Sequence, residues 1–469
     1  MLSKSLPLSG SGVYRNDTIC ALVTPPGVGG LAVVRLSGPQ AFEIADRCFR
    51  GSHSLQQAAS HTIHYGHFVH REELIDTVTA SVFRAPRSYT GEDVVEFGCH
   101  GGTIVADAIV EALIDSGARL AEPGEFTKRA FLNGKLDLVQ VEAIADLIYA
   151  TSVPGARLAA RQLVGGLRLQ LQRLRQQLLE AAALLELGLD FAEEDIELVS
   201  REELLSRLQE AQQWCQQVAS SFRAAEILRS GFFVGCVGYP NAGKSSLFNA
   251  LLRRRRAIVS PLPGTTRDYI EEGLLLNGIS VRLVDTAGLR ETEDVIELEG
   301  ITLAEQVVRQ CNLLLVVNDV TCGLEYSIEL FRQLQQRFPE AAYAYIQNKV
   351  DCLSDTSVSS SWAGLNVPVF WVSALRGDGV DELRRWIGEQ ARRSAELGVD
   401  ALVNARQAHV LQKVAEALSI AHQALLEGMP EECVAEDIRT AVRLISELTG
   451  DTWREEVLNT IFARFCIGK

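Results

Sequence analysis

Residues 238–246 read G-Y-P-N-A-G-K-S-S and fit G-x-x-x-x-G-K-[ST], the pattern of a phosphate-binding P-loop. Glycines in such a loop let backbone amides turn inward onto phosphate oxygens. Lys244 is placed for the β- and γ-phosphates, and Ser245 is placed for Mg²⁺. The apolar run 232–237 predicts a buried strand before the loop, and the apolar spacing within 247–252 predicts a helix after it. This strand–loop–helix context supports a nucleotide site.

Four further signatures follow the P-loop in a fixed order: G-T-T at 264–266, D-T-A-G at 285–288, N-K-V-D at 348–351 and S-A-L at 373–375. A threonine in the first can supply a second hydroxyl to Mg²⁺, and we choose Thr266. Asp285 is placed to hold the shell of the metal, and the Gly288 amide is placed to meet the γ-phosphate. Each signature follows a predicted strand or lies in a predicted loop.

The N-K-x-D signature resembles the guanine-reading motif of the translation-factor-like GTPases. A carboxylate that accepts both N–H groups of guanine rejects adenine, because adenine offers no matching donors. Five signatures in order therefore predict GTP as the nucleotide and a Ras-like, doubly wound α/β sheet as the fold. The predicted GTP-binding residues are Asn241, Ala242, Gly243, Lys244, Ser245, Ser246, Ser260, Pro261, Leu262, Pro263, Gly264, Thr265, Thr266, Asp285, Thr286, Ala287, Gly288, Asn348, Lys349, Asp351, Ser373 and Ala374.

The residues after Gly288 lack the glutamine that many such GTPases use to orient the attacking water. Leu289 stands there instead, and leucine cannot position water. Nearby acids could replace the glutamine or could simply solvate a switch segment, and the residues alone do not choose among them. These acids are Glu291, Glu293, Asp294, Glu297 and Glu299.

Changes in sequence pattern along the chain predict a multidomain protein. Residues 1–135 read as an α+β domain, and 229–390 read as the nucleotide domain. Residues 136–228 and 391–469 carry amphipathic helical patterns that each need the other to bury an apolar face. We therefore expect a discontinuous all-α helical domain with the Ras-like domain inserted into it.

Composition bounds the partners and the compartment. The chain has 469 residues and a net charge of −15, so bulk electrostatics do not favour nucleic-acid binding, and any contact with RNA needs a local basic surface or a partner. Ten scattered cysteines without a C-x-x-C pair fit reduced thiols. The N-terminus lacks the apolar region of a signal peptide, and no apolar run is long enough for a membrane helix, so we expect a cytoplasmic protein without membrane contact.

Beyond the nucleotide signatures, the chain resembles the MnmE (TrmE) family of tRNA modification GTPases, within the TrmE-Era-EngA-like superfamily, over nearly its whole length. The resemblance rests on T-P-P-G-V-G-G at 24–30, Y-T-G-E-D at 89–93, P-G-E-F-T-K-R-A-F-L-N-G-K-L-D at 123–137, P-G-T-T-R-D at 263–268, D-T-A-G-L-R at 285–290 and F-C-I-G-K at 465–469.

The resemblance implies a K⁺-dependent GTPase whose N-terminal domain binds folate and forms a homodimer. It also implies a partner, the FAD-dependent MnmG, in a heterotetramer or larger complex. Together the two would add an aminomethyl or carboxymethylaminomethyl group at carbon 5 of the wobble uridine (U34) of certain tRNAs. The implied cofactors are Mg²⁺, K⁺ and 5-formyl-tetrahydrofolate or a related one-carbon tetrahydrofolate.

The resemblance also assigns roles to individual residues. It implies that Glu297 orients the attacking water and that Cys466 matches a cysteine near the end of the family, with a chemical role and a packing role both open. The implied K⁺ ligands are Asn241, Ser260, Leu262 and Thr265, and the implied folate contacts are Arg35, Glu96, Lys135 and Lys469. Pro261 and Pro263 depart from the expected K⁺ loop and leave its ion affinity open.

Two other functions share the nucleotide signatures. One is a GTP-switched ribosome-assembly factor that uses hydrolysis as a timer. The other is a folate-dependent one-carbon enzyme that GTP only regulates. The N-terminal domain and the F-C-I-G-K end separate these alternatives from a tRNA modification enzyme.

Overall fold

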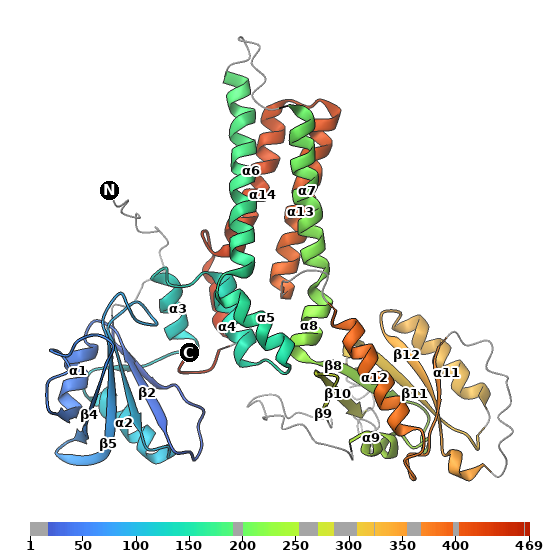
Figure 1. Ribbon diagram of the computed structural model, residues 1–469, viewed down its shortest axis with the longest axis horizontal. Coiled ribbons are helices and arrows are strands. Elements are labelled where there is room, and N and C mark those ends of the chain that lie inside the picture. The colour runs from blue at the N-terminus through green and yellow to red at the C-terminus, as the bar shows by residue number, and fades with distance from the viewer. Residues whose placement is uncertain are drawn as a thin grey trace, which may run out of the picture. The chain divides into compact units, whose positions relative to one another are not determined.

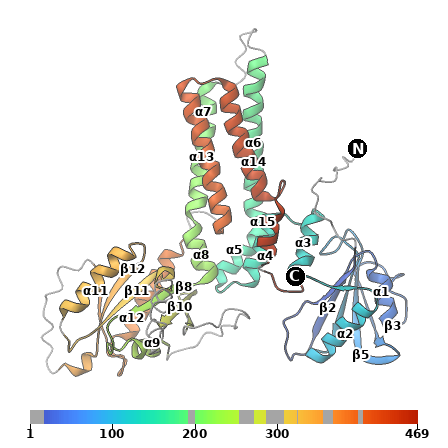
Figure 2. The ribbon, with the colours of Figure 1, turned by 180° about the vertical axis from the view of Figure 1, so that it is seen from behind.

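The computed structural model describes residues 17–190, 200–252, 271–285, 307–322, 324–353, 367–396, 403–463 and 465–469. The chain forms two compact units (Figures 1 and 2). The first comprises Met1–Ala145, Leu163–Ala183 and Ile438–Lys469, and the second comprises Asp146–Gln162 and Leu184–Asp437. The predicted division at residues 135, 228 and 390 stays a prediction.

A seven-stranded sheet organises the first unit, in the order β3-β4-β5-β6-β2-β1-β7. Neighbouring strands are antiparallel except β1 and β7, which are parallel. The strands are β1 (Ile19–Leu22), β2 (Ala32–Ser37), β3 (Phe49–Gly51), β4 (Thr62–His70), β5 (Glu73–Phe83), β6 (Val94–Cys99) and β7 (Arg119–Leu120).

The alternation of side chains along β1 explains how both faces of this sheet are covered. Cys20 belongs to one core with helices α1 (Ala41–Cys48) and α2 (Thr103–Asp115). Ile19 and Ala21 point the other way and pack with Phe126, which lies on α3 (Glu125–Leu132). The predicted α+β domain is confirmed, with α3 on the face opposite α1 and α2.

The helices that follow in the first unit bury the predicted apolar stripes. Helix α4 (Leu138–Ile148) and helix α15 (Glu455–Phe462) share an aromatic and aliphatic core with α3 and Phe465. Part of α6 (Gly166–Asp190) lies beside part of α14 (Glu431–Thr449), where Arg175 Nε donates to Ser446 Oγ at 3.0 Å. The buried residues of these stripes include Leu167, Leu171, Leu174, Leu178, Ile438, Ile445 and Leu448.

A six-stranded sheet organises the second unit, in the order β13-β12-β11-β8-β10-β9. All neighbours are parallel except β9 and β10. The strands are β8 (Phe232–Val237), β9 (Glu271–Leu276), β10 (Ile279–Asp285), β11 (Leu313–Asp319), β12 (Ala342–Asn348) and β13 (Val369–Trp371). This strand order, with β9 antiparallel to its neighbour β10 and all other pairs parallel, confirms the predicted Ras-like sheet.

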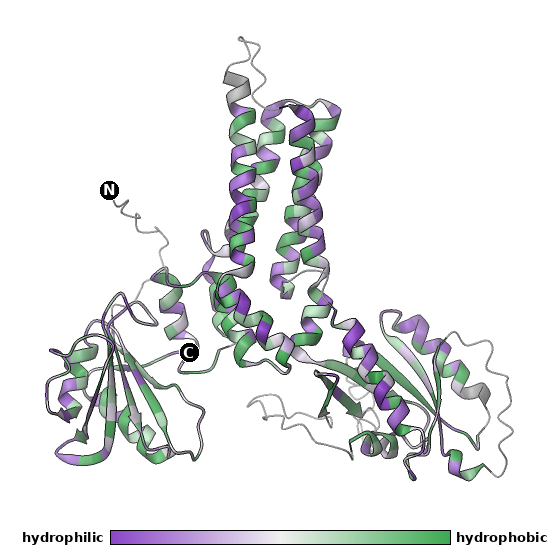
Figure 3. Cartoon of the chain, viewed as in Figure 1, coloured by the Kyte–Doolittle hydropathy of each residue, from purple (hydrophilic) through white to green (hydrophobic). Residues whose placement is uncertain are grey.

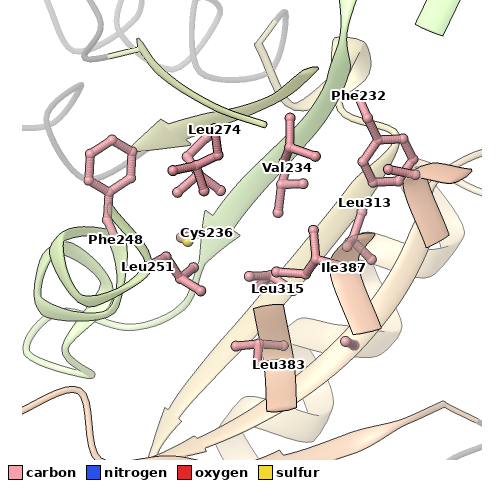
Figure 4. Close-up of a cluster of buried hydrophobic side chains, with 14 of the residues drawn as sticks. Phe232, Val234, Cys236, Phe248, Leu251, Leu274, Leu313, Leu315, Leu383 and Ile387 are labelled. Atoms are coloured by element: carbon pink, nitrogen blue, oxygen red, sulfur yellow. The ribbon is translucent and has the colours of Figure 1, made fainter. Parts of the chain in front are cut away.

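Helices cover both faces of the second sheet. Helices α9 (Lys244–Leu252) and α12 (Val380–Ser394) lie over one face, where Phe248, Leu251 and Ile387 pack against β8 and β11 (Figure 4). Helix α11 (Leu324–Arg337) lies over the other face, where Phe331 packs against Tyr343. The sheet is therefore buried on both sides, which explains why its central strands read as continuous apolar runs.

Two long helices of the second unit, α7 (Arg201–Ser220) and α13 (Ala405–Glu427), pack side by side. Both mix hydrophobic and hydrophilic residues along their length, as one buried face requires (Figure 3). Ser200 caps the start of α7, because Ser200 Oγ accepts a hydrogen bond from Glu203 N. Asn404 and Gln407 form a reciprocal capping box on α13 that the sequence analysis missed.

Two further helices of this unit, α5 (Val153–Leu163) and α8 (Phe222–Ser230), pack against the nucleotide domain. Ala159 of α5 and Ile227 of α8 belong to the same core as β8. Ser152 Oγ donates to Leu228 O at 2.9 Å, which joins the start of α5 to α8. Within the described part of the chain, no helix is long and apolar enough to cross a membrane.

Candidate functional site

The P-loop lies between β8 and α9, as predicted, and its glycines are required by its backbone. Gly238 has φ +156° and Gly243 has φ +88°. A Cβ atom at Gly238 would collide with the carbonyl oxygen of Val317, and one at Gly243 would collide with Nδ2 of Asn348. Only glycine lets the loop turn this tightly against the ends of β11 and β12.

The remaining P-loop residues present polar groups at the start of α9. Asn241 is exposed and holds a left-handed backbone with φ 63°. Lys244 Nζ donates to the carbonyl oxygen of Tyr239 at 2.9 Å, so its ammonium lies over the loop. Ser245 and Ser246 are exposed in the first turn of α9. Unsatisfied amide groups at the start of a helix favour anions such as phosphate.

Asn348 links three segments that are far apart in the sequence. Its Nδ2 donates to the carbonyl oxygen of Ala242 in the P-loop at 3.0 Å. Its Oδ1 accepts a hydrogen bond from Ala374 N at 3.1 Å. The side chain is buried, so both bonds are shielded from water. Asn348 therefore fixes the phosphate loop and the 373–374 loop to the end of β12.

Asp351 is held as a charged acceptor next to these loops. Ser373 Oγ donates to Asp351 Oδ1 at 2.6 Å, and Arg376 N donates to Ser373 Oγ at 3.0 Å. The Ser373 hydroxyl is the main cause that holds the pKa of Asp351 below its ordinary value. The carboxylate is therefore ionised at neutral pH and can accept the two N–H groups of a guanine edge.

Lys349 pairs with an acid that the sequence analysis did not single out. Its Nζ lies 2.5 Å from Asp319 Oδ2, at the end of the neighbouring strand β11. This hydrogen bond raises the pKa of Lys349. Burial alone would raise the pKa of Asp319, but the bond from Lys349 brings that pKa below its ordinary value. The pairing of Asp319 with Asn348 across the two strands could have indicated this contact once the sheet order was known.

The other half of the predicted nucleotide site lies mostly outside the described residues. This applies to Ser260, Pro261, Leu262, Pro263, Gly264, Thr265, Thr266, Thr286, Ala287, Gly288 and Glu297. The backbone of Asp285 is described: it ends β10 and pairs with Cys236 of β8, directly before the P-loop. The two stretches that carry Mg²⁺ signatures therefore begin from adjacent parallel strands.

A second group of predicted residues meets on the sheet of the first unit. Arg35 of β2 pairs with Glu96 of β6, and Arg35 Nε donates to Glu96 Oε1 at 2.8 Å. Both side chains are largely buried, at 14% and 25% exposure. Lys469 is close enough for both charges to act on it. Burial and then Arg35 lower its pKa, while Glu96 opposes them. The Arg35–Glu96 pair and the Lys469 side chain thus lie within electrostatic range of one another in a partly buried place.

The last five residues reach this place by packing on α3 and β1. Phe126 N donates to the carbonyl oxygen of Lys469 at 3.1 Å, and Gly124 N donates to that of Cys466 at 3.3 Å. Gly468 has φ +100°, and a Cβ there would collide with the carbonyl oxygen of Leu22. Cys466 itself is exposed.

Lys135, the fourth predicted folate residue, makes a different contact. Its Nζ donates to the carbonyl oxygen of Pro86 at 3.0 Å. This bond ties Lys135 to the loop between β5 and β6, which also carries Tyr89. The structure therefore pairs Arg35 with Glu96, leaves Lys469 within range of both charges, and places Lys135 against the neighbouring loop.

The strand order, the P-loop and the Asn348–Asp351 loop define a P-loop GTPase with a Ras-like sheet. Two family models match the chain: the GTP-binding protein TrmE N-terminus over residues 18–135, and the MnmE helical domain over residues 138–466. The chain belongs to the MnmE family of tRNA modification GTPases.

Curated relatives agree over nearly the full length. The tRNA modification GTPase MnmE of Chlorobaculum tepidum is 41% identical over 459 residues, which cover 96% of this chain and 97% of the relative. The protein of the same name from Chlamydia trachomatis serovar L2 is 41% identical over 466 residues, which cover 97% of this chain and 100% of the relative.

Solved structures of other GTPases match part of the chain. Aquifex aeolicus Era bound to GDP·AlF₄⁻ is 27% identical and covers 34% of this chain and 56% of its own, with a TM-score of 0.26. The G domain of the T. maritima FeoB iron transporter is 23% identical and covers 35% of this chain and 99% of its own, with a TM-score of 0.27.

Proposed function

We propose that this GTPase reads guanine through Asp351 and couples GTP hydrolysis to the modification of tRNA. The observation that carries the proposal is the ionised Asp351 carboxylate, held by Ser373 beside the P-loop that Asn348 anchors. A fixed carboxylate discriminates strongly for a base with two neighbouring N–H donors. Membership of the MnmE family supplies tRNA modification as the purpose of hydrolysis and favours it over ribosome assembly.

The phosphate half of the site would use the P-loop and two cations. Lys244 would contact the β- and γ-phosphates, and Ser245 with Thr266 would hold Mg²⁺. The exposed amide of Asn241, on a left-handed backbone, is free to turn toward a K⁺ ion shared with Ser260, Leu262 and Thr265. Bound K⁺ would add positive charge beside the charge that develops on the phosphates in the transition state. We assign Glu297 to orienting the attacking water.

We propose that the side chains of Arg35, Glu96 and Lys469 form a pocket that binds a one-carbon tetrahydrofolate such as 5-formyl-tetrahydrofolate. The side-chain cations of Arg35 and Lys469 would suit the carboxylates of the glutamate tail of folate. Glu96 adds an acceptor for the N–H groups of the pterin ring. Lys135 would approach the ligand from the neighbouring loop.

We further propose that the chain acts in the cytoplasm as a homodimer through its N-terminal domain and with the FAD-dependent MnmG. The two proteins would add an aminomethyl or carboxymethylaminomethyl group at carbon 5 of U34. The support for this chemistry is membership of the MnmE family of tRNA modification GTPases.

One experiment tests the two sites on one sample. GTP turnover by the purified full chain is measured in K⁺ and in Na⁺ at equal ionic strength, and binding of 5-formyl-tetrahydrofolate is measured by calorimetry. We expect turnover at least about tenfold faster in K⁺, as an added charge at the transition state requires, together with saturable folate binding. Equal turnover in both salts would refute the K⁺ site, and absence of folate binding would refute the pocket.

A further inference from the structure

The guanidinium of Arg35 contacts two aromatic rings. Its Cζ is 4.9 Å from the centre of the Tyr89 ring and 5.4 Å from the centre of the Phe126 ring. Both distances fall within the range of a cation–π contact, which strengthens when the cation is desolvated, as this largely buried arginine is. The rings and Glu96 together constrain where the planar group lies.

The Tyr89 ring is itself fixed, because α3 and the residues after it hold its loop. The hydroxyl of Tyr89 lies 2.8 Å from Thr127 Oγ1 on α3. Asn133 Nδ2 donates to the carbonyl oxygen of Thr90 at 2.8 Å, and Arg129 pairs with Glu92 at 3.1 Å. The motifs at 89–93 and 123–137 thus form one rigid assembly against the strand that carries Arg35.

The guanidinium keeps donors available for a ligand. Arg35 Nε donates to Glu96, while Nη1 and Nη2 make no hydrogen bond to any other residue in the described ranges. An arginine presents these two nitrogens as a planar fork that matches a carboxylate or a ring carbonyl. Burial raises the pKa of Tyr89, so its ring stays neutral beside the cation.

We infer that Tyr89 is a positioning residue of the folate pocket: its ring, together with that of Phe126, holds the Arg35 guanidinium in the plane from which Nη1 and Nη2 meet the ligand. This inference rests on the proposed folate site and adds a residue that the sequence analysis did not assign. A flat ring is what the role requires, and the Tyr89 hydroxyl serves only to anchor the loop at Thr127.

The test compares three variants of the full chain by calorimetry with 5-formyl-tetrahydrofolate. Tyr89→Leu removes the ring and is expected to weaken binding about tenfold, the size of a desolvated cation–π contact. Tyr89→Phe keeps the ring and loses the bond to Thr127, so its Kd stays within about twofold of wild type. Thr127→Val is the matched control for the lost hydroxyl pair and behaves like Tyr89→Phe. Circular dichroism and thermal unfolding check the fold of each variant.

A second background separates positioning from direct contact with the ligand. In Arg35→Lys, the flexible ammonium has no plane to hold, so Tyr89→Leu adds less than about threefold. An undiminished tenfold loss there would show that the ring touches the ligand itself and would overturn the positioning role. Equal losses for Tyr89→Phe and Tyr89→Leu, or no loss for either, would also overturn it. Failure of wild type to bind folate overturns the proposed pocket, whereas normal wild-type binding with an unaffected Tyr89→Leu overturns this inference alone.

Discussion

The nucleotide site and the Arg35 pocket are built in opposite ways. Each described part of the nucleotide site is a short continuous segment at the end of a strand, and the backbone at Gly238 and Gly243 sets the turn of the P-loop. The Arg35 pocket draws single side chains from β2, β6, α3, the β5–β6 loop and the end of the chain.

This difference decides what a sequence can reveal. A site built from the backbone needs particular residues at fixed spacing, so each of its motifs can be recognised separately in the sequence. A side-chain-built pocket needs only that distant residues converge, and no spacing along the chain records that convergence. We expect the two sites to differ also in how substitutions reduce turnover and ligand binding.

The largest effect is expected at the residue assigned to the attacking water. Glu297→Ala should lower kcat for GTP by about 10²–10⁴-fold, the usual contribution of a group that acts on a reacting water or proton. Its Kd for a non-hydrolysable GTP analogue should stay near the wild-type value, because the residue acts on water and not on nucleotide. Loss of nucleotide binding in this variant would refute the assigned role. Glu299→Ala is the matched control and should turn over GTP at nearly the wild-type rate.

The next largest effect is expected at Asp351 and tests whether its carboxylate recognises the guanine base. Asp351→Asn replaces one acceptor with a donor, so GTP affinity should fall roughly 10²–10³-fold. Xanthosine triphosphate carries a carbonyl where guanine carries an amino group, so it should bind the variant better than GTP does. Competition binding with the two nucleotides measures the change in preference. A variant that loses both nucleotides equally would show that Asp351 supports the loop and does not read the base.

A pH titration probes the side-chain-built pocket. The pKa of Lys469 is lowered mainly by burial and then by Arg35, so this lysine loses its proton below the ordinary range of the free side chain. Affinity for the anionic folate should therefore fall about tenfold as pH rises through the lowered pKa, the size of one charge-assisted hydrogen bond. The unliganded chain should gain stability over the same window, because the unfolded state binds more protons there.

The matched control for this titration is Lys469→Met, whose folate affinity should start low and stay flat over the same pH range. Folate binding measured by calorimetry at several pH values distinguishes the two chains. A wild-type affinity that is as independent of pH as that of Lys469→Met would show that Lys469 does not contribute to folate binding.

The smallest effect is expected at Ser373, whose hydroxyl donates a hydrogen bond to Asp351. Ser373→Ala removes the hydroxyl that donates to Asp351 Oδ1 and that chiefly lowers its pKa. The carboxylate then regains rotational freedom, so GTP affinity should fall about threefold to tenfold, the value of one hydrogen bond to a charged group. Ser373→Thr should restore most of the affinity. An Ala variant with unchanged affinity would mean that the loop at 373–374 acts only through the Ala374 amide.

The sequence could predict most of the second unit because its strands are buried on both faces. The runs at 232–237, 281–284, 313–317, 343–347 and 369–372 correspond to β8, β10, β11, β12 and β13. Asp319 was missed because its partner Lys349 becomes its neighbour only through sheet pairing. Tyr89 was missed as an individual residue, since only the folded chain brings its ring over Arg35.

The first unit was predicted less completely for the same reason. Strand β4 was not singled out, because its exposed positions hold Ile63 and Tyr65, and this weakens the alternation that marks a half-buried strand. Arg129 lies in the 123–137 motif but received no role of its own, yet it is buried and pairs with Asp17, Glu92 and Glu125. Such a network becomes visible only when the loop at 89–93 and α3 are placed together.

The central claim is that GTP hydrolysis at the backbone-built site drives tRNA modification. The most direct measurement is nucleoside mass spectrometry of unmodified tRNA incubated with the full chain, the FAD-dependent MnmG, GTP, K⁺ and a one-carbon tetrahydrofolate. The account predicts that a C5-substituted wobble uridine appears with the wild-type chain and does not appear with Glu297→Ala, although that variant still binds GTP. Unsubstituted U34 with the wild-type chain, or equal modification with Glu297→Ala, would contradict it.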